Sequence, residues 1–274
     1  MCDCQILPLL AHLPPDERTR ICRAIGAVAA EIGKILVGNV PSFYLCGSLV
    51  LGDLRAELSD IDLLVLTQQP ITDEQAHRLV GLRQQLTERD AANPWYRKLE
   101  GGMLSLQAFC SGEADTVVYW GTSGERVTDR YRFDSFSRKI LLEQGLLLLG
   151  QDVRKAIAAP SKDELAADIR AHYHAICTHA QTTKRSIYAF GWLMDIARGL
   201  YTLETGEVTS KTQAARWALE RGLCPVAGKL AAALIVRRNA RMFAESIALG
   251  DMAENLGADV QRFAKALGDV LNKV

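Results

Sequence analysis

The chain has 274 residues, of which 49% are hydrophobic and 23% are charged, and its formal net charge is zero. This length can form one large domain or two smaller ones with a substantial core, and the composition is that of an ordinary globular protein. A net charge of zero disfavours a nucleic-acid partner, and no apolar run is long enough to predict a membrane-spanning helix.

The cysteines indicate a reducing environment. Seven of them are scattered along the chain, an odd number in a long sequence, which predicts free thiols rather than a disulfide framework. The N-terminus lacks a basic segment followed by an apolar one, so no export signal is visible. We therefore expect a cytoplasmic protein without a membrane partner.

The first half of the chain alternates between helical and strand-like patterns. A helix is expected from Asp16 to about Val37, because apolar residues recur there at helical spacing after two prolines. Further helices are expected near 72–90 and 134–146, and strands near 42–46, 61–67, 99–109 and 116–120. This order predicts a small mixed β-sheet with flanking helices.

From Ser161 onward only helical patterns remain. They lie near 161–181, 184–204, 210–222, 225–248 and 251–272, as in a helical bundle. The break at Pro160-Ser161 separates them from the mixed half. We therefore predict an α+β fold with an N-terminal domain over residues 1–157 and an α-helical domain over residues 158–274.

Two short motifs in the first half suggest chemistry on a nucleotide. Gly47-Ser48 is followed eleven residues later by Asp60-Ile61-Asp62, which opens an apolar strand. Carboxylates two positions apart on a strand point to the same face, and a divalent cation would compensate their charge. Gly47 lets the backbone approach a phosphate closely, and Ser48 adds a hydroxyl. The alternative is that Asp60 only caps a turn and Asp62 is a solvated charge.

The pattern Gly-Ser-x11-Asp-x-Asp resembles the signature of the DNA polymerase β-type nucleotidyltransferases. The resemblance implies that residues 1–157 form a nucleotidyltransferase domain. It also implies that Asp60 and Asp62 bind two Mg²⁺ ions and that Gly47 and Ser48 hold the phosphates of the nucleotide.

Sites of this type commonly contain a third carboxylate on a neighbouring strand. Glu100 is the favoured candidate, because it enters an alternating run that predicts a strand. As a metal ligand or a general base it would complete the site; the alternative is a surface charge beside Arg97 and Lys98. Glu113 and Asp115 lie in a segment that reads as a hairpin turn, where solvated charges are the better interpretation.

The helical half resembles the C-terminal domain of the aminoglycoside adenylyltransferases of the streptomycin/spectinomycin type. The resemblance rests on the segments 196–211 and 214–220, and together with the first motif it spans most of residues 40–225. It implies that Arg198 and Lys211 bind the phosphates of ATP. Lys211 follows a possible helix cap at Ser210, where the free N–H groups of a first turn attract anions. The alternatives are a solvated Lys211 and an Arg198 that pairs with Glu204 or Glu207.

The resemblance implies a function: Mg²⁺-dependent transfer of AMP from ATP to a hydroxyl of a small-molecule acceptor, most simply an aminoglycoside-type antibiotic, with release of pyrophosphate. The acceptor end departs from the family, because Lys184 and Arg185 stand where an acidic drug contact is expected. A nucleotidyltransferase that modifies a protein or another non-antibiotic acceptor, and a nucleotide-binding protein without catalysis, are the alternatives. We expect a monomer or a weak homodimer.

Overall fold

The structure is a computed structural model, which describes residues 3–122 and 124–273. Contacts between Cα atoms divide the chain into two compact units, Met1–Ala159 and Pro160–Val274. The sequence places the boundary two residues earlier, at 157/158, and whether each unit is an independent folding domain stays a prediction. The mixed first unit and the helical second unit confirm the predicted α+β fold.

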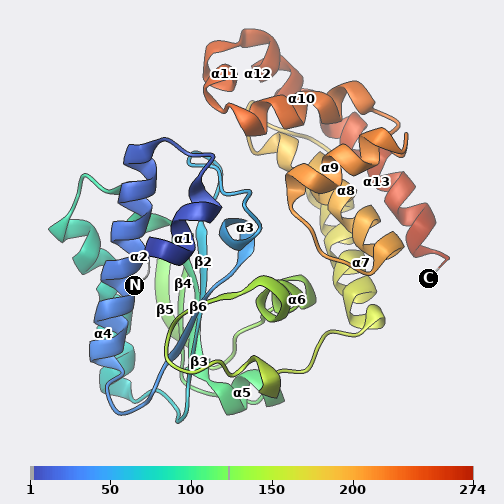
Figure 1. Ribbon diagram of the computed structural model, residues 1–274. Helices are drawn as coiled ribbons and strands as arrows, with labels where there is room; N and C mark the ends of the chain where they lie inside the picture. Colours follow the sequence, from blue (N-terminus) through green and yellow to red (C-terminus); the bar gives the residue numbers. More distant parts are fainter. Residues whose placement is uncertain (1–2, 123, 274) are drawn as a thin grey trace. The chain divides into compact units, whose positions relative to one another are not determined.

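The first unit is built on a mixed sheet with the strand order β5-β4-β3-β2-β1-β6. Its strands are β1 (Ser42–Leu45), β2 (Ile61–Thr67), β3 (Leu99–Ser105), β4 (Val117–Gly121), β5 (Gly124–Thr128) and β6 (Leu146–Leu149). The neighbours β2 and β3 run parallel, and the other pairs are antiparallel. The long helices α2 (Pro15–Ile35) and α4 (Asp73–Arg89) lie side by side on one face of this sheet (Figure 1).

The opposite face of the sheet carries the shorter helices. These are α3 (Gly47–Val50), α5 (Leu106–Ser111) and α6 (Ser135–Gln144); short turns at Asp3–Ile6 (α1), Leu7–Leu10, Pro94–Lys98 and Arg154–Ala156 complete the unit. Leu64 and Leu66 of β2 pack on this side against Ala108 of α5 and Leu141 of α6. Because side chains alternate along a strand, Asp62 lies on the same face as these leucines.

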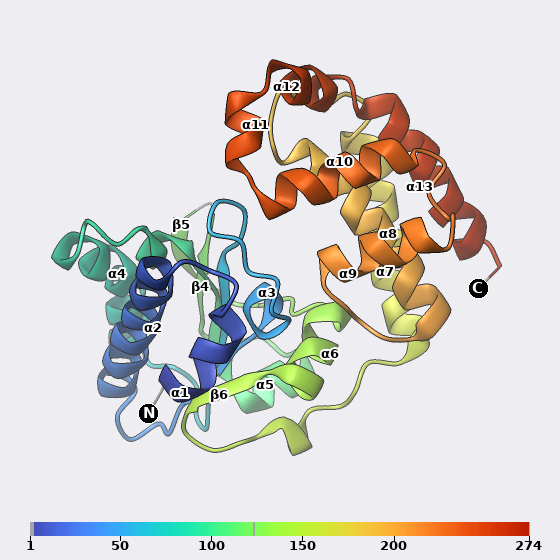
Figure 2. The same ribbon diagram turned by 45° about the horizontal axis from the view of Figure 1, so that its top comes forward.

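The second unit contains only helices, as the sequence predicts. They are α7 (Lys162–His179), α8 (Ala189–Thr205), α9 (Lys211–Glu220), α10 (Ala227–Arg238), α11 (Arg241–Glu245), α12 (Ile247–Glu254) and α13 (Gly257–Leu271). The helices α7, α8 and α13 run alongside one another (Figure 2). α13 buries Val260, Phe263, Leu267 and Leu271, a spacing of three and four residues that forms one helical face.

The first unit differs from the sequence prediction in the end of one strand, in one turn and in two additional strands. β3 ends at Ser105, not at residue 109, because the Ser105 hydroxyl accepts a hydrogen bond from the Ala108 N–H at 3.2 Å and starts α5. The predicted hairpin turn at 111–115 is wrong, since Gly112, with φ of +72°, ends α5 there. The strands β5 and β6 are absent from the prediction.

The predicted helices of the second unit are too long in three places. The helix expected at 184–204 begins at Ala189, and the one expected at 225–248 is interrupted at Asn239. The helix expected at 251–272 begins at Gly257, where a Cβ atom would lie 2.1 Å from the Gln181 carbonyl oxygen. At Gly257, the start of the helix thus packs against a segment distant in sequence.

Two further sequence expectations concern membranes and thiols. In residues 3–122 and 124–273 no helix combines the length and the apolar character that crossing a bilayer requires. Cys22, Cys46, Cys110, Cys177 and Cys224 are free thiols, and Cys2 lies outside the described residues.

Candidate active site

The two aspartates of the first motif flank the start of β2. Ile61, between them, is completely buried, so Asp60 and Asp62 both point to the other face of the strand. Asp62 is in register with Glu100 on the parallel strand β3. The structure therefore brings the three predicted carboxylates together on one face of the sheet, at the N-terminal ends of β2 and β3, and each of them is partly exposed.

The Gly-Ser turn packs directly against Asp62. Gly47 has φ of +63°, and a Cβ atom at this position would lie 1.8 Å from Asp62 Oδ2. The Ser48 N–H donates a hydrogen bond to the Asp62 carboxylate, and the Cys46 N–H donates to the Asp62 carbonyl oxygen at 2.9 Å. The space left by the missing side chain of Gly47 is thus filled by the carboxylate.

Burial raises the pKa of every carboxyl group at this site, and repulsion between carboxylates adds to it at Asp62 and Glu100. Burial, followed by the charges of Asp60 and Glu100, raises the pKa of Asp62 to about 7. Burial and then Asp60 raise the pKa of Glu100, and burial raises the pKa of Asp60, partly offset by Lys98 and Arg83. Lys98 and Arg83 compensate the negative charge of this cluster only in part, so the cluster attracts a cation.

The donor set fits Mg²⁺. Hard carboxylate oxygens are its preferred ligands, and it is usually held by one or two carboxylates together with substrate phosphates. Among the described residues, no three His, Cys, Asp or Glu side chains are already arranged to hold a metal ion. Asp60 and Asp62, with Glu100 beside them, could therefore hold Mg²⁺ in combination with phosphate oxygens.

Sequence reasoning missed two residues that shape this site. Arg83 of α4 is buried; it donates to the carbonyl oxygens of Leu99 (2.9 Å) and Gly121 (3.0 Å), and its charge lowers the pKa of Glu100. Tyr131 packs on Gly102, where a Cβ atom would lie 2.5 Å from its ring. The adjacent glycines 101 and 102 in a strand were the available signal for a close approach.

The other acidic candidates lie elsewhere. The Asp115 carboxylate accepts hydrogen bonds from the N–H groups of Ser105 (2.9 Å) and Thr116 (2.7 Å), at the end of β3 opposite Glu100. Glu113 is exposed in the loop after α5. Glu113 therefore fits the interpretation as a solvated loop charge, whereas Asp115 is partly buried and binds backbone N–H groups.

In the second unit, Arg198 and Lys211 converge on one carboxylate. Asp195 of α8 is nearly buried, with a side chain 11% exposed, and it pairs with Lys211 at 3.0 Å and Arg198 at 3.2 Å. His172 of α7 lies 3.8 Å from the same carboxylate. The alternative partner Glu204 instead pairs with Arg221.

The charged groups in this cluster shift the pKa values of one another. Burial alone would raise the pKa of Asp195, but the surrounding cations outweigh it and hold the pKa well below its ordinary value. Burial lowers the pKa of Lys211, partly offset by Asp195. The Ser210 hydroxyl accepts from the Gln213 N–H at 3.2 Å and caps α9, so Lys211 lies in the first turn as predicted.

The basic residues that depart from the family pattern lie before α8, not within it. Arg185 pairs with Asp251 and also donates to the Ile247 carbonyl oxygen at 3.2 Å, which ties this segment to α12. Lys184 precedes it in the same segment.

Two family models match the chain in the order of its two units. Residues 29–94 match the nucleotidyltransferase domain, and residues 157–248 match the C-terminal domain of aminoglycoside adenylyltransferase. The first range contains the Gly-Ser turn and both aspartates, and the second contains Arg198 and Lys211. The protein is therefore a nucleotidyltransferase.

Structural comparison shows that the fold of the chain is shared with a solved protein. Its fold is similar to that of the spectinomycin adenyltransferase AAD(9) from Enterococcus faecialis, solved with ATP and spectinomycin. The TM-score is 0.64 at 16% identity, over 90% of this chain and 98% of that chain. No curated protein sequence gives a match. The two family matches identify an enzyme similar to the aminoglycoside adenylyltransferases, and the structural likeness agrees with them in fold.

Proposed function

We propose that the enzyme transfers AMP from ATP to a hydroxyl of a small-molecule acceptor and releases pyrophosphate, in a reaction that requires Mg²⁺. The observation that carries this proposal is the register pair Asp62–Glu100, with Asp60 beside it and the Gly47-Ser48 turn packed against it. This arrangement provides a cation site next to a backbone turn that can approach phosphates.

Each residue has a defined part in the proposed reaction. Asp60 and Asp62 hold Mg²⁺, proposed as two ions, which would neutralise the charge of the phosphates and polarise the α-phosphate. Gly47 and Ser48 orient the triphosphate through the backbone and the hydroxyl. The acceptor oxygen forms a bond to the α-phosphorus, the bond to the pyrophosphate oxygen breaks, and Glu100 accepts the hydroxyl proton.

The raised pKa of Glu100 supports its role as a base, because a stronger base removes a hydroxyl proton more readily. The helical unit contributes Arg198 and Lys211 to the triphosphate. Asp195 is a positioning residue in this proposal, since it contacts both cations.

An aminoglycoside-type antibiotic is the proposed acceptor. The support is the match of residues 157–248 to the aminoglycoside adenylyltransferase C-terminal domain and the similarity to a structure that contains spectinomycin. Lys184 carries the wrong charge for a polycationic drug, which favours an acceptor with few amino groups, whereas the charge of Arg185 is compensated by Asp251.

The test is pyrophosphate release with ATP, Mg²⁺ and a panel of acceptors, including aminoglycosides, spectinomycin, neutral alcohols and intact proteins. We expect turnover with an antibiotic acceptor only, and none in excess chelator. Glu100→Gln should lower kcat by about 10²- to 10⁴-fold. Glu113→Gln, an exposed loop carboxylate, is the control and should leave kcat unchanged. Pyrophosphate release with proteins as the only active acceptors would refute the proposed acceptor class. Full turnover in Glu100→Gln would refute the role of Glu100 as the base.

A further inference from the structure

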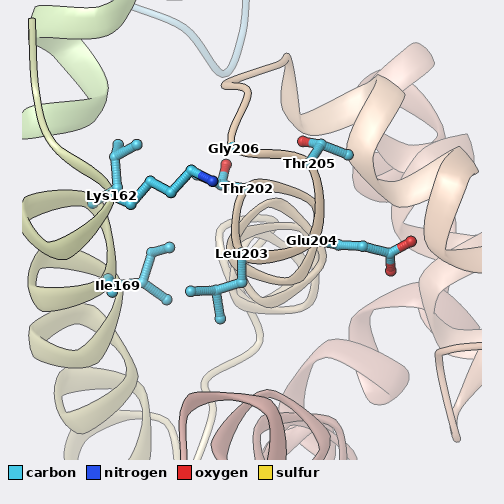
Figure 3. A pocket seen from close by; sticks show the side chains of 9 residues that line it. Lys162, Ile169, Thr202, Leu203, Glu204, Thr205 and Gly206 are labelled. Atoms are coloured by element: carbon cyan, nitrogen blue, oxygen red, sulfur yellow. The ribbon is translucent and has the colours of Figure 1, made fainter. Parts of the chain in front are cut away.

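A pocket lies within the helical unit, and none of the residues that line it belongs to the Asp195 cluster. It forms between the first turns of α7 and the last turn of α8 and has a volume of about 120 Å³. Its apolar wall comes from Leu165, Ala166, Ile169 and Leu203, and its polar residues include Lys162 and Thr202. Ile169 and Leu203 face each other across the pocket (Figure 3).

Thr202 differs from other threonines in helices of this protein. The hydroxyls of Thr87, Thr178 and Thr205 each donate to the carbonyl oxygen four residues earlier, at 2.8–2.9 Å. Thr202 is only 2% exposed, yet its hydroxyl has no hydrogen-bond partner within the described part of the chain. A buried hydroxyl without a partner costs about 1–3 kcal/mol, so a ligand that satisfies it gains affinity.

The ammonium group of Lys162 and the Thr202 side chain lie on the same side of the pocket (Figure 3). Lys162 is the first residue of α7, where the free N–H groups of the helix add positive potential. Of the two acids in this first turn, Glu164 is engaged in the helix cap, since it accepts from the Ser161 N–H at 2.8 Å, and Asp163 is exposed. The Glu204 carboxylate points away from Lys162 and pairs with Arg221.

We propose that this pocket binds a small aliphatic monocarboxylate. One carboxylate oxygen accepts from the Lys162 ammonium and the Thr202 hydroxyl, and the alkyl tail contacts the apolar wall. A cavity of about 150 Å³ takes up benzene, so this pocket has room for an acid of three or four carbons. Inorganic phosphate fits poorly, because it has no apolar part to cover Leu165 and Ile169.

The experiment is a titration of the full-length protein with propionate, followed by NMR of isotope-labelled leucine, isoleucine and alanine methyl groups. We expect saturable shifts at Leu165, Ala166, Ile169 and Leu203, with affinity in about the millimolar range that a ligand of five heavy atoms allows. Propionamide, of the same shape but uncharged, should bind at least about tenfold more weakly.

Substitutions of Lys162 and Thr202 test whether propionate binds in this pocket. Lys162→Gln, at an exposed position, should weaken propionate about tenfold or more, and Thr202→Val, nearly isosteric, about three- to tenfold. Lys265→Gln and Thr178→Val are controls elsewhere on the helices and should bind as the parent does. The proposal is overturned if no methyl shift saturates, if Lys162→Gln binds equally well, or if inorganic phosphate binds as tightly as propionate. If Thr202→Val does not fold, Lys162→Gln and propionamide still decide the question.

Discussion

Gly47 and Gly52 share a left-handed backbone, with φ of +63° at both, but only Gly47 touches the candidate active site. A Cβ atom at Gly47 would lie 1.8 Å from Asp62 Oδ2, whereas nothing lies within 4 Å of one at Gly52. Alanine costs roughly 1–2 kcal/mol in this conformation at either position. The two substitutions therefore separate backbone strain from displacement of Asp62.

We expect Gly47→Ala to lower turnover by about 10²-fold, because Asp62 must move by an ångström or more. Gly52→Ala should lose similar stability and keep most of its turnover. Pyrophosphate release and thermal unfolding of both variants check this. Equal turnover in the two variants would mean that the close contact between Gly47 and Asp62 is not needed for catalysis.

Asp62 also predicts how stability depends on pH in the metal-free protein. Its pKa is raised from an ordinary value near 4 to about 7, so the folded state binds the proton more tightly than the unfolded chain does. The free energy of unfolding should therefore fall as the pH rises from about 4 to about 7. Asp62→Asn should flatten this fall while abolishing transfer. Urea unfolding in chelator from pH 4 to 8 measures it; an identical slope in the variant would contradict the raised pKa.

The Asp195 cluster joins the helices α8 and α9, and it can be compared with an ion pair at the surface. Asp195 is nearly buried between Lys211 and Arg198, whereas the Asp251–Arg185 pair is largely exposed. Breaking a buried pair leaves a cation without compensation and costs about 3–5 kcal/mol, while an exposed pair contributes at most about 1 kcal/mol. Because both cations are about 30% exposed, we place Asp195→Asn near 2–3 kcal/mol, within the range set by those limits.

Denaturant unfolding of Asp195→Asn and of the control Asp251→Asn should show this difference at pH 7. The pKa of Asp195 is depressed, so its contribution is fully present above the unfolded value near 4 and is lost as the pH falls below that value. The two variants should therefore converge toward acid pH. Equal destabilisation at pH 7 would show that burial of Asp195 contributes nothing.

Local sequence patterns predicted the helices and strands that have a cap or an apolar run of their own. They failed where contacts with distant residues determine the secondary structure. The helix expected near 72–90 is α4, which starts at a capping box of Thr72 and Gln75. The two-residue period of a strand places Asp62 of β2 on the face opposite the buried Ile61. By contrast, β5 has one apolar residue, Val127, and is a strand only because it pairs with β4. Residues 106–109 read as a continuation of the strand, since the capping bond between Ser105 and Ala108 is not visible in the sequence.

For the molecule as a whole, the sequence predicted the two-part architecture and the three carboxylates, because a strand register and a motif spacing place them. It did not predict that Arg198 and Lys211 share Asp195. It also did not predict that Arg83 and Tyr131 shape the carboxylate site. These side chains come from α4 and from the loop before α6, and only the folded chain brings them there.

The proposed roles of Arg198 and Lys211 make ATP binding a property of the whole chain rather than of residues 1–159 alone. Hydrogen bonds to charged groups contribute about 1.5–3 kcal/mol, so Lys211→Ala and Arg198→Ala should each weaken ATP binding roughly 10- to 100-fold. ATP should also raise the affinity for the acceptor, and by linkage the acceptor should raise the affinity for ATP by the same factor. Both variants should reduce that factor.

Calorimetry of ATP binding, with and without a non-reacting acceptor analogue, measures both quantities. Lys265→Ala, an exposed lysine on α13, is the control and should match the parent enzyme. Thermal unfolding must accompany the titrations, because Lys211→Ala also deprives Asp195 of a partner. Loss of ATP affinity in a variant that stays folded assigns the cation to the phosphates. Unchanged ATP affinity in both variants would assign the helical unit to the acceptor alone, since the carboxylates and the Gly-Ser turn would then suffice for the nucleotide.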